Sequence, residues 1–144
     1  MPQSMMTPVL ALIVWTFVLW IWMYATRIPA IRKAGIDPAS VKGKDALALL
    51  PARVNWVADN YNHLHEQPTV FYALAIYSHL VGVKDELNVA LAWAYVALRV
   101  VHSLVQATSN YVPVRFYIFA AATLMLMVMT ARNVWALIVT AAAV

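Results

Sequence analysis

Residues 55–68 have the sequence NWVADNYNHLHEQP, a polar stretch that runs directly into the apolar segment 69–81. Four of its acidic and amide side chains recur every three or four residues, which places these four on one face of a helix. They are Asn55, Asp59, Asn62 and Glu66. Acidic groups on a helix that enters a membrane are costly unless other groups in the protein bind them. The partners of this polar face therefore decide how the other helices must be arranged.

The composition is that of an integral membrane protein. Of the 144 residues 64% are hydrophobic and only 11% are charged, whereas a soluble domain is about half apolar and a quarter charged. The absence of cysteine excludes disulfides, thiolate metal sites and a cysteine nucleophile, and three scattered glycines exclude a glycine-rich phosphate loop. The lipid bilayer is the expected partner, and a net charge of +4 concentrated in one loop does not indicate nucleic-acid binding.

Four apolar segments predict an all-α protein, a four-helix transmembrane bundle in a single domain that covers residues 1–144. The expected helices cover about 8–26, 53–81, 86–109 and 113–140. Pro68 lies inside the second of these, where it leaves the carbonyl of Leu64 unpaired and predicts a kink.

The segment 27–53 is a polar connection that carries six of the ten basic residues. Those six are Arg27, Arg32, Lys33, Lys42, Lys44 and Arg53. By the positive-inside rule this loop is cytoplasmic, and orientation alone accounts for most of its charge. Four spans then place both termini on the opposite side, and a bacterial inner membrane is the expected location.

A second polar face follows on the third helix, with Arg99, His102, Gln106 and Asn110. Counted from the turn near Val83, Glu66 is 17 residues before it and Arg99 is 16 after it, so both lie about 25 Å from the turn. The same count matches Asn62 with His102. It also matches Asp59 with Gln106, and Asn55 with Asn110.

This matching predicts an ion pair between Glu66 and Arg99, with hydrogen bonds from Asn62 and His102. Two interpretations remain open for the matched faces. One is a structural ion pair between helices, and the other is a polar cleft, open to the cytoplasm, that binds a ligand. Four matched pairs exceed what one helix contact needs, so we favour the cleft.

Arg115 lies two residues after Pro113, in the first turn of the fourth helix. A cation there opposes the helix dipole, but beside the free N–H groups of a helix start it forms a site for developing negative charge, such as a thiolate. The alternative is a side chain that only reaches for the membrane interface. His63 and His102 have similar depths and could share a metal or haem, but two histidines give no metal-ligand spacing, so we expect no metal site.

At these residues the chain resembles a known family. The pattern Asn62-x-x-x-Glu66-x-Pro68-x-x-Phe71-Tyr72, then Arg99-Val100-Val101-His102-Ser103, Asn110, Pro113 and Arg115, is similar to the MAPEG superfamily. That superfamily comprises membrane-associated proteins in eicosanoid and glutathione metabolism. The resemblance covers residues 55–115 and is closest to bacterial members and to microsomal glutathione transferase and prostaglandin E synthase.

The resemblance implies a homotrimer of four-helix subunits that binds glutathione between subunits on the cytoplasmic side. It implies that Glu66, Arg99 and His102 contact glutathione and that Arg115 stabilises the thiolate. A family asparagine corresponds to His63, which adjoins Asn62. A basic glutathione contact at the end of the first helix corresponds to Arg27 or Arg32.

Two positions depart from the family pattern. Asp59 stands where the family has an arginine, and Gln106 stands where it has a tyrosine. An acidic group in place of a basic one predicts weaker binding of anionic glutathione.

The leading hypothesis is a glutathione-dependent membrane transferase or peroxidase that acts on lipophilic electrophiles. The second is a catalytically silent MAPEG-like protein that binds an amphipathic ligand or a partner protein. A small four-helix exporter is the third, and it is disfavoured because such proteins carry an essential glutamate in their first helix, which here has no charge.

Overall fold

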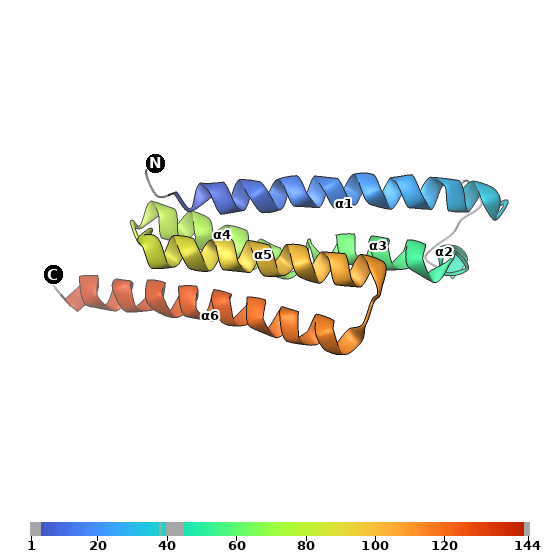
Figure 1. Ribbon diagram of the computed structural model, residues 1–144. Helices are drawn as coiled ribbons and strands as arrows, with labels where there is room; N and C mark the ends of the chain where they lie inside the picture. Colours follow the sequence, from blue (N-terminus) through green and yellow to red (C-terminus); the bar gives the residue numbers. More distant parts are fainter. Residues whose placement is uncertain (1–3, 38, 40–44, 143–144) are drawn as a thin grey trace.

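The computed structural model describes residues 4–37, 39 and 45–142, and within them the chain is helical with no β-strand. Its helices are α1 (Met6–Lys33), α2 (Asp45–Ala48), α3 (Ala52–His63), α4 (Gln67–Leu80), α5 (Glu86–Thr108) and α6 (Val112–Ala142). In Figure 1, α1 lies along one side and α6 along the other, with α3, α4 and α5 between them. The start of α1 and the end of α6 lie at the same end, opposite α2.

The helix α1 is longer than predicted and ends at Lys33 instead of residue 26. It continues through Pro29 and closes with a Schellman motif, in which Gly35 (φ 65°) donates to the carbonyl of Arg32 and Ile36 donates to that of Ile31. The basic side chains of its last turn, Arg32 and Lys33, interact favourably with the negative end of the helix dipole. The hydrophobic segment therefore predicted the location of α1 correctly, but the helix extends beyond the end of that segment.

The second predicted helix, 53–81, is not continuous. It is divided into α3 and α4 by Leu64, His65 and Glu66, and the backbone of Glu66 (φ −94°, ψ −99°) is not helical. Pro68 is therefore not inside a helix but in the first turn of α4, where its missing N–H would have no intrahelical partner anyway. The sequence located the disturbance correctly, but the structure resolves it as a break and not a kink.

The helix α5 is the centre of the bundle and packs against α1, α3 and α6. After the break, α4 packs against α1 and α6, and its Phe71 stacks on Tyr95 of α5 with ring centroids 4.5 Å apart. The buried apolar core lies between α1 and these helices. It includes Leu12, Leu19, Met23, Val57, Leu64, Phe71, Ala92, Tyr95, Val96, Leu126 and Met129.

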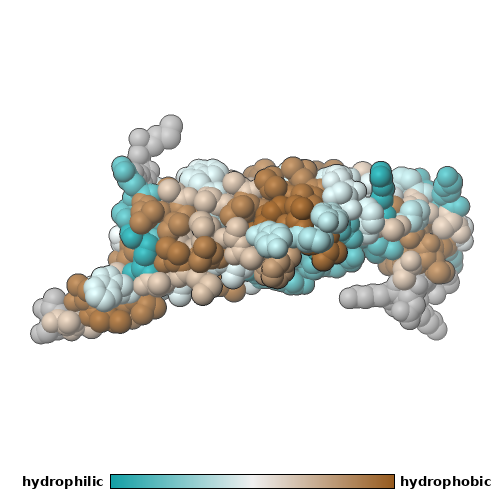
Figure 2. Space-filling model, turned by 60° about the horizontal axis from the view of Figure 1, so that its bottom comes forward, coloured by the Kyte–Doolittle hydropathy of each residue, from teal (hydrophilic) through white to brown (hydrophobic). Residues whose placement is uncertain are grey.

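Three helices, α1, α5 and α6, are long and apolar enough to cross a membrane. With 12 and 14 residues, α3 and α4 are each shorter than a span, which needs about 20 residues, but together they fill the place of the fourth. Figure 2 shows apolar side chains over much of the middle of one face, with hydrophilic ones toward both ends. The protein is therefore an integral membrane helical bundle, as the composition predicts.

A polar clamp fastens α6 to the start of α5 at the end opposite α2. Arg132 donates to the Asp85 carboxylate at 2.6 Å and to Oδ1 of Asn88 at 2.8 Å. Asn88 is fully buried and in turn donates to the carbonyl of Val83 at 2.8 Å. A long side chain from α6 thus satisfies a buried amide on the neighbouring helix.

We predict that Arg132→Ala lowers the stability of the detergent-solubilised protein more than Asp85→Asn does. Asp85→Asn removes an exposed ion pair, which contributes about 0–1 kcal/mol. Arg132→Ala also leaves the buried Oδ1 of Asn88 without its donor, at a cost of about 1–3 kcal/mol. Thermal unfolding measures both, with Lys33→Ala as the exposed control. Equal losses for the two variants would show that the bond to Asn88 does not matter.

Candidate functional site

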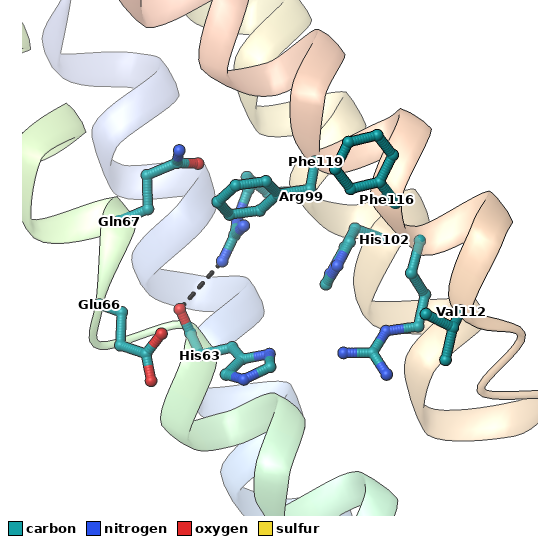
Figure 3. A pocket seen from close by; sticks show the side chains of 9 residues that line it. His63, Glu66, Gln67, Arg99, His102, Val112, Phe116 and Phe119 are labelled. Carbon is teal, nitrogen blue, oxygen red and sulfur yellow. Dashed lines mark hydrogen bonds between the residues drawn. The ribbon is translucent and has the colours of Figure 1, made fainter.

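A cavity of about 340 Å³ opens where the break between α3 and α4 faces α5 and the start of α6. We call it the inner cavity. It is lined by His63, Glu66, Gln67, Arg99, His102, Val112, Arg115, Phe116 and Phe119. Figure 3 shows Glu66, Gln67 and His63 on one side of this space, with His102, Phe116 and Phe119 across from them. The break thus brings polar groups from α3 and α4 to face aromatic ones from α6.

Arg99 reaches this cavity from the middle of α5, and its side chain is only 1% exposed. Its Nη2 donates to the backbone carbonyl of His63 at 2.9 Å, the bond drawn in Figure 3. The predicted ion pair with Glu66 is not formed. Among the described residues, the only ion pair joins Arg132 to Asp85. The prediction treated residues 53–81 as one helix. At the break, the carbonyl of His63 accepts a turn hydrogen bond from the N–H of Glu66 at 3.3 Å in place of a regular helical one, and Arg99 donates a second bond to it.

The contact between α3 and α5 has the predicted depth but uses a different face of α3. Asn60 donates to the carbonyl of Ser103 at 3.4 Å, and the ring of His63 is 3.1 Å from Oε1 of Gln106. The hydrogen bonds predicted from Asn62 and His102 to a Glu66–Arg99 pair are not among those of the described residues, where Nδ1 of His102 has no partner. The face that carries residues 60 and 63 packs on α5, because the neighbouring Val57 and Leu64 are apolar and are buried beside it.

The predicted polar face of α3 instead borders a second, more polar cavity of about 490 Å³, which we call the outer cavity. It is lined by Asp59, Asn62, His63, Glu66, Gln106, Asn110 and Arg115. His63, Glu66 and Arg115 line both cavities, so the two adjoin at these side chains. We refer to the two adjoining cavities together as the cleft; the polar residues matched by depth line it, but the pairs among them differ from those predicted.

Arg115 is held by the turn between α5 and α6. Its Nη1 donates to Oδ1 of Asn110, whose backbone is left-handed (φ 51°). Asparagine tolerates this conformation better than most residues, and it commonly ends a helix there. The backbone of the turn and the orientation of the guanidinium therefore depend on the same residue.

Aromatic rings cover the inner cavity on the α6 side. The guanidinium carbon of Arg99 lies 5.8 Å from the ring centroid of Phe119, within the range of a cation–π contact, and the ring of His102 lies 6.3 Å from the same ring. Sequence reasoning missed Phe116, Phe119 and Gln67 as lining residues. The spacing of Phe119, four residues after Arg115 on one helix face, is a signal that could have found it.

Gln67 is fixed by the helices around it. Its Nε2 donates to the hydroxyl of Thr123 on α6 at 2.8 Å, and its Oε1 accepts from the hydroxyl of Tyr95 on α5 at 3.4 Å. Gln67 therefore joins three helices at the inner cavity and sets the separation between α4 and α6 there.

Not every predicted site residue reaches the cleft. Arg32 is exposed in the last turn of α1 and lines neither cavity. Arg27, the other basic candidate, lines a third cavity of about 390 Å³ together with Asn55, Asp59 and Asn62. His63 and His102 both line the inner cavity, but the described part of the chain contains no group of three side chains that could hold a metal ion.

Substitutions at Asn110 separate its two roles. We predict that Asn110→Ala destabilises the solubilised protein by about 1–2 kcal/mol more than Asn110→Gly, because only glycine adopts a positive φ without strain. Both variants lose the bond to Arg115, so their difference isolates the backbone conformation. Thermal unfolding measures it, and equal stability of the two variants would contradict a left-handed residue 110.

Of the comparisons with known proteins, one identifies the family to which this chain belongs. No curated protein and no solved structure matches this chain. The sequence profile of the MAPEG family matches residues 5–135, which include all of α3, α4 and α5, both cavities and most of α1 and α6. Because the match covers most of the sequence, the chain belongs to the MAPEG family.

Proposed function

We propose that this protein is a glutathione-dependent transferase or peroxidase that acts on lipophilic electrophiles in the membrane. Its family supports a glutathione-related activity at a membrane. The cleft supports the same chemistry, because a polar outer cavity adjoins an inner one that combines two guanidinium groups with aromatic walls. A hydrophilic thiol and a lipophilic partner would meet at that junction.

The observation that carries this proposal is the set of unused hydrogen-bond donors around the inner cavity. Among the described residues, Nε and Nη1 of Arg99 and Nε of Arg115 are buried without a partner. Buried donors without partners lower stability, and those of a guanidinium bind carboxylates and other anions best. A bound anion would therefore be stabilised by groups that the fold leaves unsatisfied.

Arg115 is the proposed catalytic residue. It lies in the first turn of α6, where backbone N–H groups have no helical partner and the helix dipole favours negative charge. A thiol bound there would lose its proton to solvent more readily, and its pKa would fall below the ordinary value of about 8.5. In a transferase reaction the thiolate sulfur would then form a bond to the electrophilic carbon as the leaving group departs.

Glutathione contacts are proposed for the residues around this position. Arg99 and His102 would bind it from α5, with Gln106 at the outer end of the same face. Glu66, His63 and Asn62 would bind it from the break and from α3. Because Arg32 lies outside both cavities, it could contribute only from a neighbouring subunit of the proposed homotrimer.

The orientation follows from the basic loop. We place residues 27–53 in the cytoplasm and both termini across the membrane, so that the outer cavity opens toward cytoplasmic glutathione. The electrophile would come from the bilayer past Phe116, whose side chain is 64% exposed on α6.

We predict that Arg115→Ala raises the thiol pKa of bound glutathione to near its value in solution. The same change should lower kcat about 100-fold, a typical loss when one charge-stabilising donor is removed. Arg115→Lys keeps the charge but not the planar fork that reaches Asn110, so its effect should be intermediate. Thiolate ultraviolet absorbance across a pH series measures the pKa, and conjugation of a lipophilic electrophile measures kcat.

Arg53→Ala is the matched control, because this exposed arginine at the start of α3 lines neither cavity. If the thiol titrates identically in the wild type and in Arg115→Ala, Arg115 does not stabilise the thiolate.

A catalytically silent protein that binds an amphipathic ligand or a partner protein is the second candidate. It is favoured by Asp59, a carboxylate that borders the outer cavity, where it would repel the carboxylates of glutathione. Calorimetry with glutathione in detergent separates the two functions. No binding by an intact oligomer would favour the silent protein.

A further inference from the structure

The two cavities differ in the sign of the charges that line them. In the inner cavity, two guanidiniums, those of Arg99 and Arg115, face a single carboxylate, that of Glu66. Among the described residues that line the outer cavity, the carboxylates of Asp59 and Glu66 face one guanidinium, that of Arg115. The cleft is thus basic at its inner end and acidic at its outer end.

Within the part of the chain that the structure describes, the two carboxylates have no ion-pair partner. Among the described residues, Asp59 and Glu66 form no ion pair, and no side-chain hydrogen bond to either carboxylate is present. Both side chains are exposed, and the neighbouring groups in the outer cavity are His63 and the amides of Asn62, Gln106 and Asn110. The amide oxygens of Gln106 and Asn110 are engaged with His63 and Arg115. The acceptors that remain among these side chains are the two carboxylates and the amide oxygen of Asn62, and of these only the carboxylates are charged.

The buried end provides an independent indication of a ligand. Arg99 is 99% removed from solvent, and two of its nitrogens have no partner among the described residues. An anionic group bound there would orient an elongated molecule along the cleft. Its other end would then lie beside Asp59.

We infer that the outer cavity binds a primary ammonium group of the thiol co-substrate and that Asp59 is the residue that selects it. This inference rests on the proposed function, since it assigns the other end of the same ligand. An ammonium beside Asp59 gains a favourable charge interaction, whereas a carboxylate in the same place is repelled. Asp59 thus favours binding of a thiol compound whose amino group is distant from its sulfur atom.

Two sources of the ammonium have the same chemistry. One is the α-ammonium of the γ-glutamyl end of glutathione. The other is an amine attached to the glycyl end, as in a glutathione coupled to a diamine by an amide bond. Arg27 lines the cavity on the other side of Asp59 and could bind a carboxylate, so either end of the tripeptide could point this way.

The test is a binding cycle by calorimetry in detergent with three probes that cannot react. They are S-methylglutathione, its N-acetyl derivative and its glycyl diamine amide. Each is titrated into the wild type, Asp59→Asn and the control Glu86→Gln, which alters an exposed carboxylate in the first turn of α5, outside both cavities.

We expect Asp59→Asn to weaken an ammonium-bearing probe about tenfold, as for one ion pair at a partly exposed site. Glu86→Gln should change nothing. If the N-acetyl derivative binds the wild type about tenfold more weakly than S-methylglutathione does, and its affinity does not change in Asp59→Asn, then Asp59 binds the γ-glutamyl ammonium. If only the diamine amide depends on Asp59, the amine is at the glycyl end.

Other outcomes overturn the inference. Tighter or unchanged binding of both ammonium-bearing probes to Asp59→Asn would show that Asp59 does not bind an ammonium, and so would the absence of binding by every probe. A conjugation assay with the free thiols separates this from the proposed function. If conjugation occurs at the same rate with and without Asp59, the ammonium site is wrong but the proposed enzymatic function stands. If binding depends on Asp59 but no thiol is conjugated, the ammonium site stands and the proposed enzymatic function is wrong.

Discussion

The hydrogen bond from Arg99 to the carbonyl of His63 is the interaction on which the site depends. A guanidinium in the middle of a membrane helix must find acceptors, and here it finds one because α3 stops at His63. Because the chain leaves the helix before Pro68, that carbonyl has a turn bond from Glu66 in place of a regular helical one, and it accepts the guanidinium as well. The inner cavity, the buried arginine and the break between α3 and α4 thus belong to one arrangement. In it, the end of a helix stabilises a buried cation.

The same arrangement explains how one cleft holds groups of both charges. Because Arg99 binds backbone and not Glu66, the carboxylate remains available where the inner and outer cavities meet. Arg115 is directed toward the same junction by Asn110, in a turn that needs a left-handed residue. The two guanidiniums are therefore held by a helix end and a turn, Arg99 by a backbone carbonyl and Arg115 by the side chain of Asn110.

Burial decided which polar residues of α3 contact α5. Counting residues from the turn gave the right depth, since Asn60 and His63 contact Ser103 and Gln106. It gave the wrong face, because depth along an antiparallel pair is a property of chain length and rise per residue, whereas rotation about the axis is decided by packing. Val57 and Leu64 direct one side of α3 toward the core, and this turns Asp59 and Asn62 to the outer cavity.

The sequence by itself determined the all-helical membrane class, the location of the disturbance near Pro68 and most of the residues around the cleft. These follow from local properties: hydrophobic length, proline geometry and the spacing of polar side chains. Only the tertiary structure decided that α3 and α4 are separate helices, that Arg99 binds a carbonyl and not Glu66, and that Phe116, Phe119 and Gln67 complete the walls. The reason is that a helix break and a helix rotation are chosen by competition among packing, backbone satisfaction and charge, and these terms involve segments far apart in the chain.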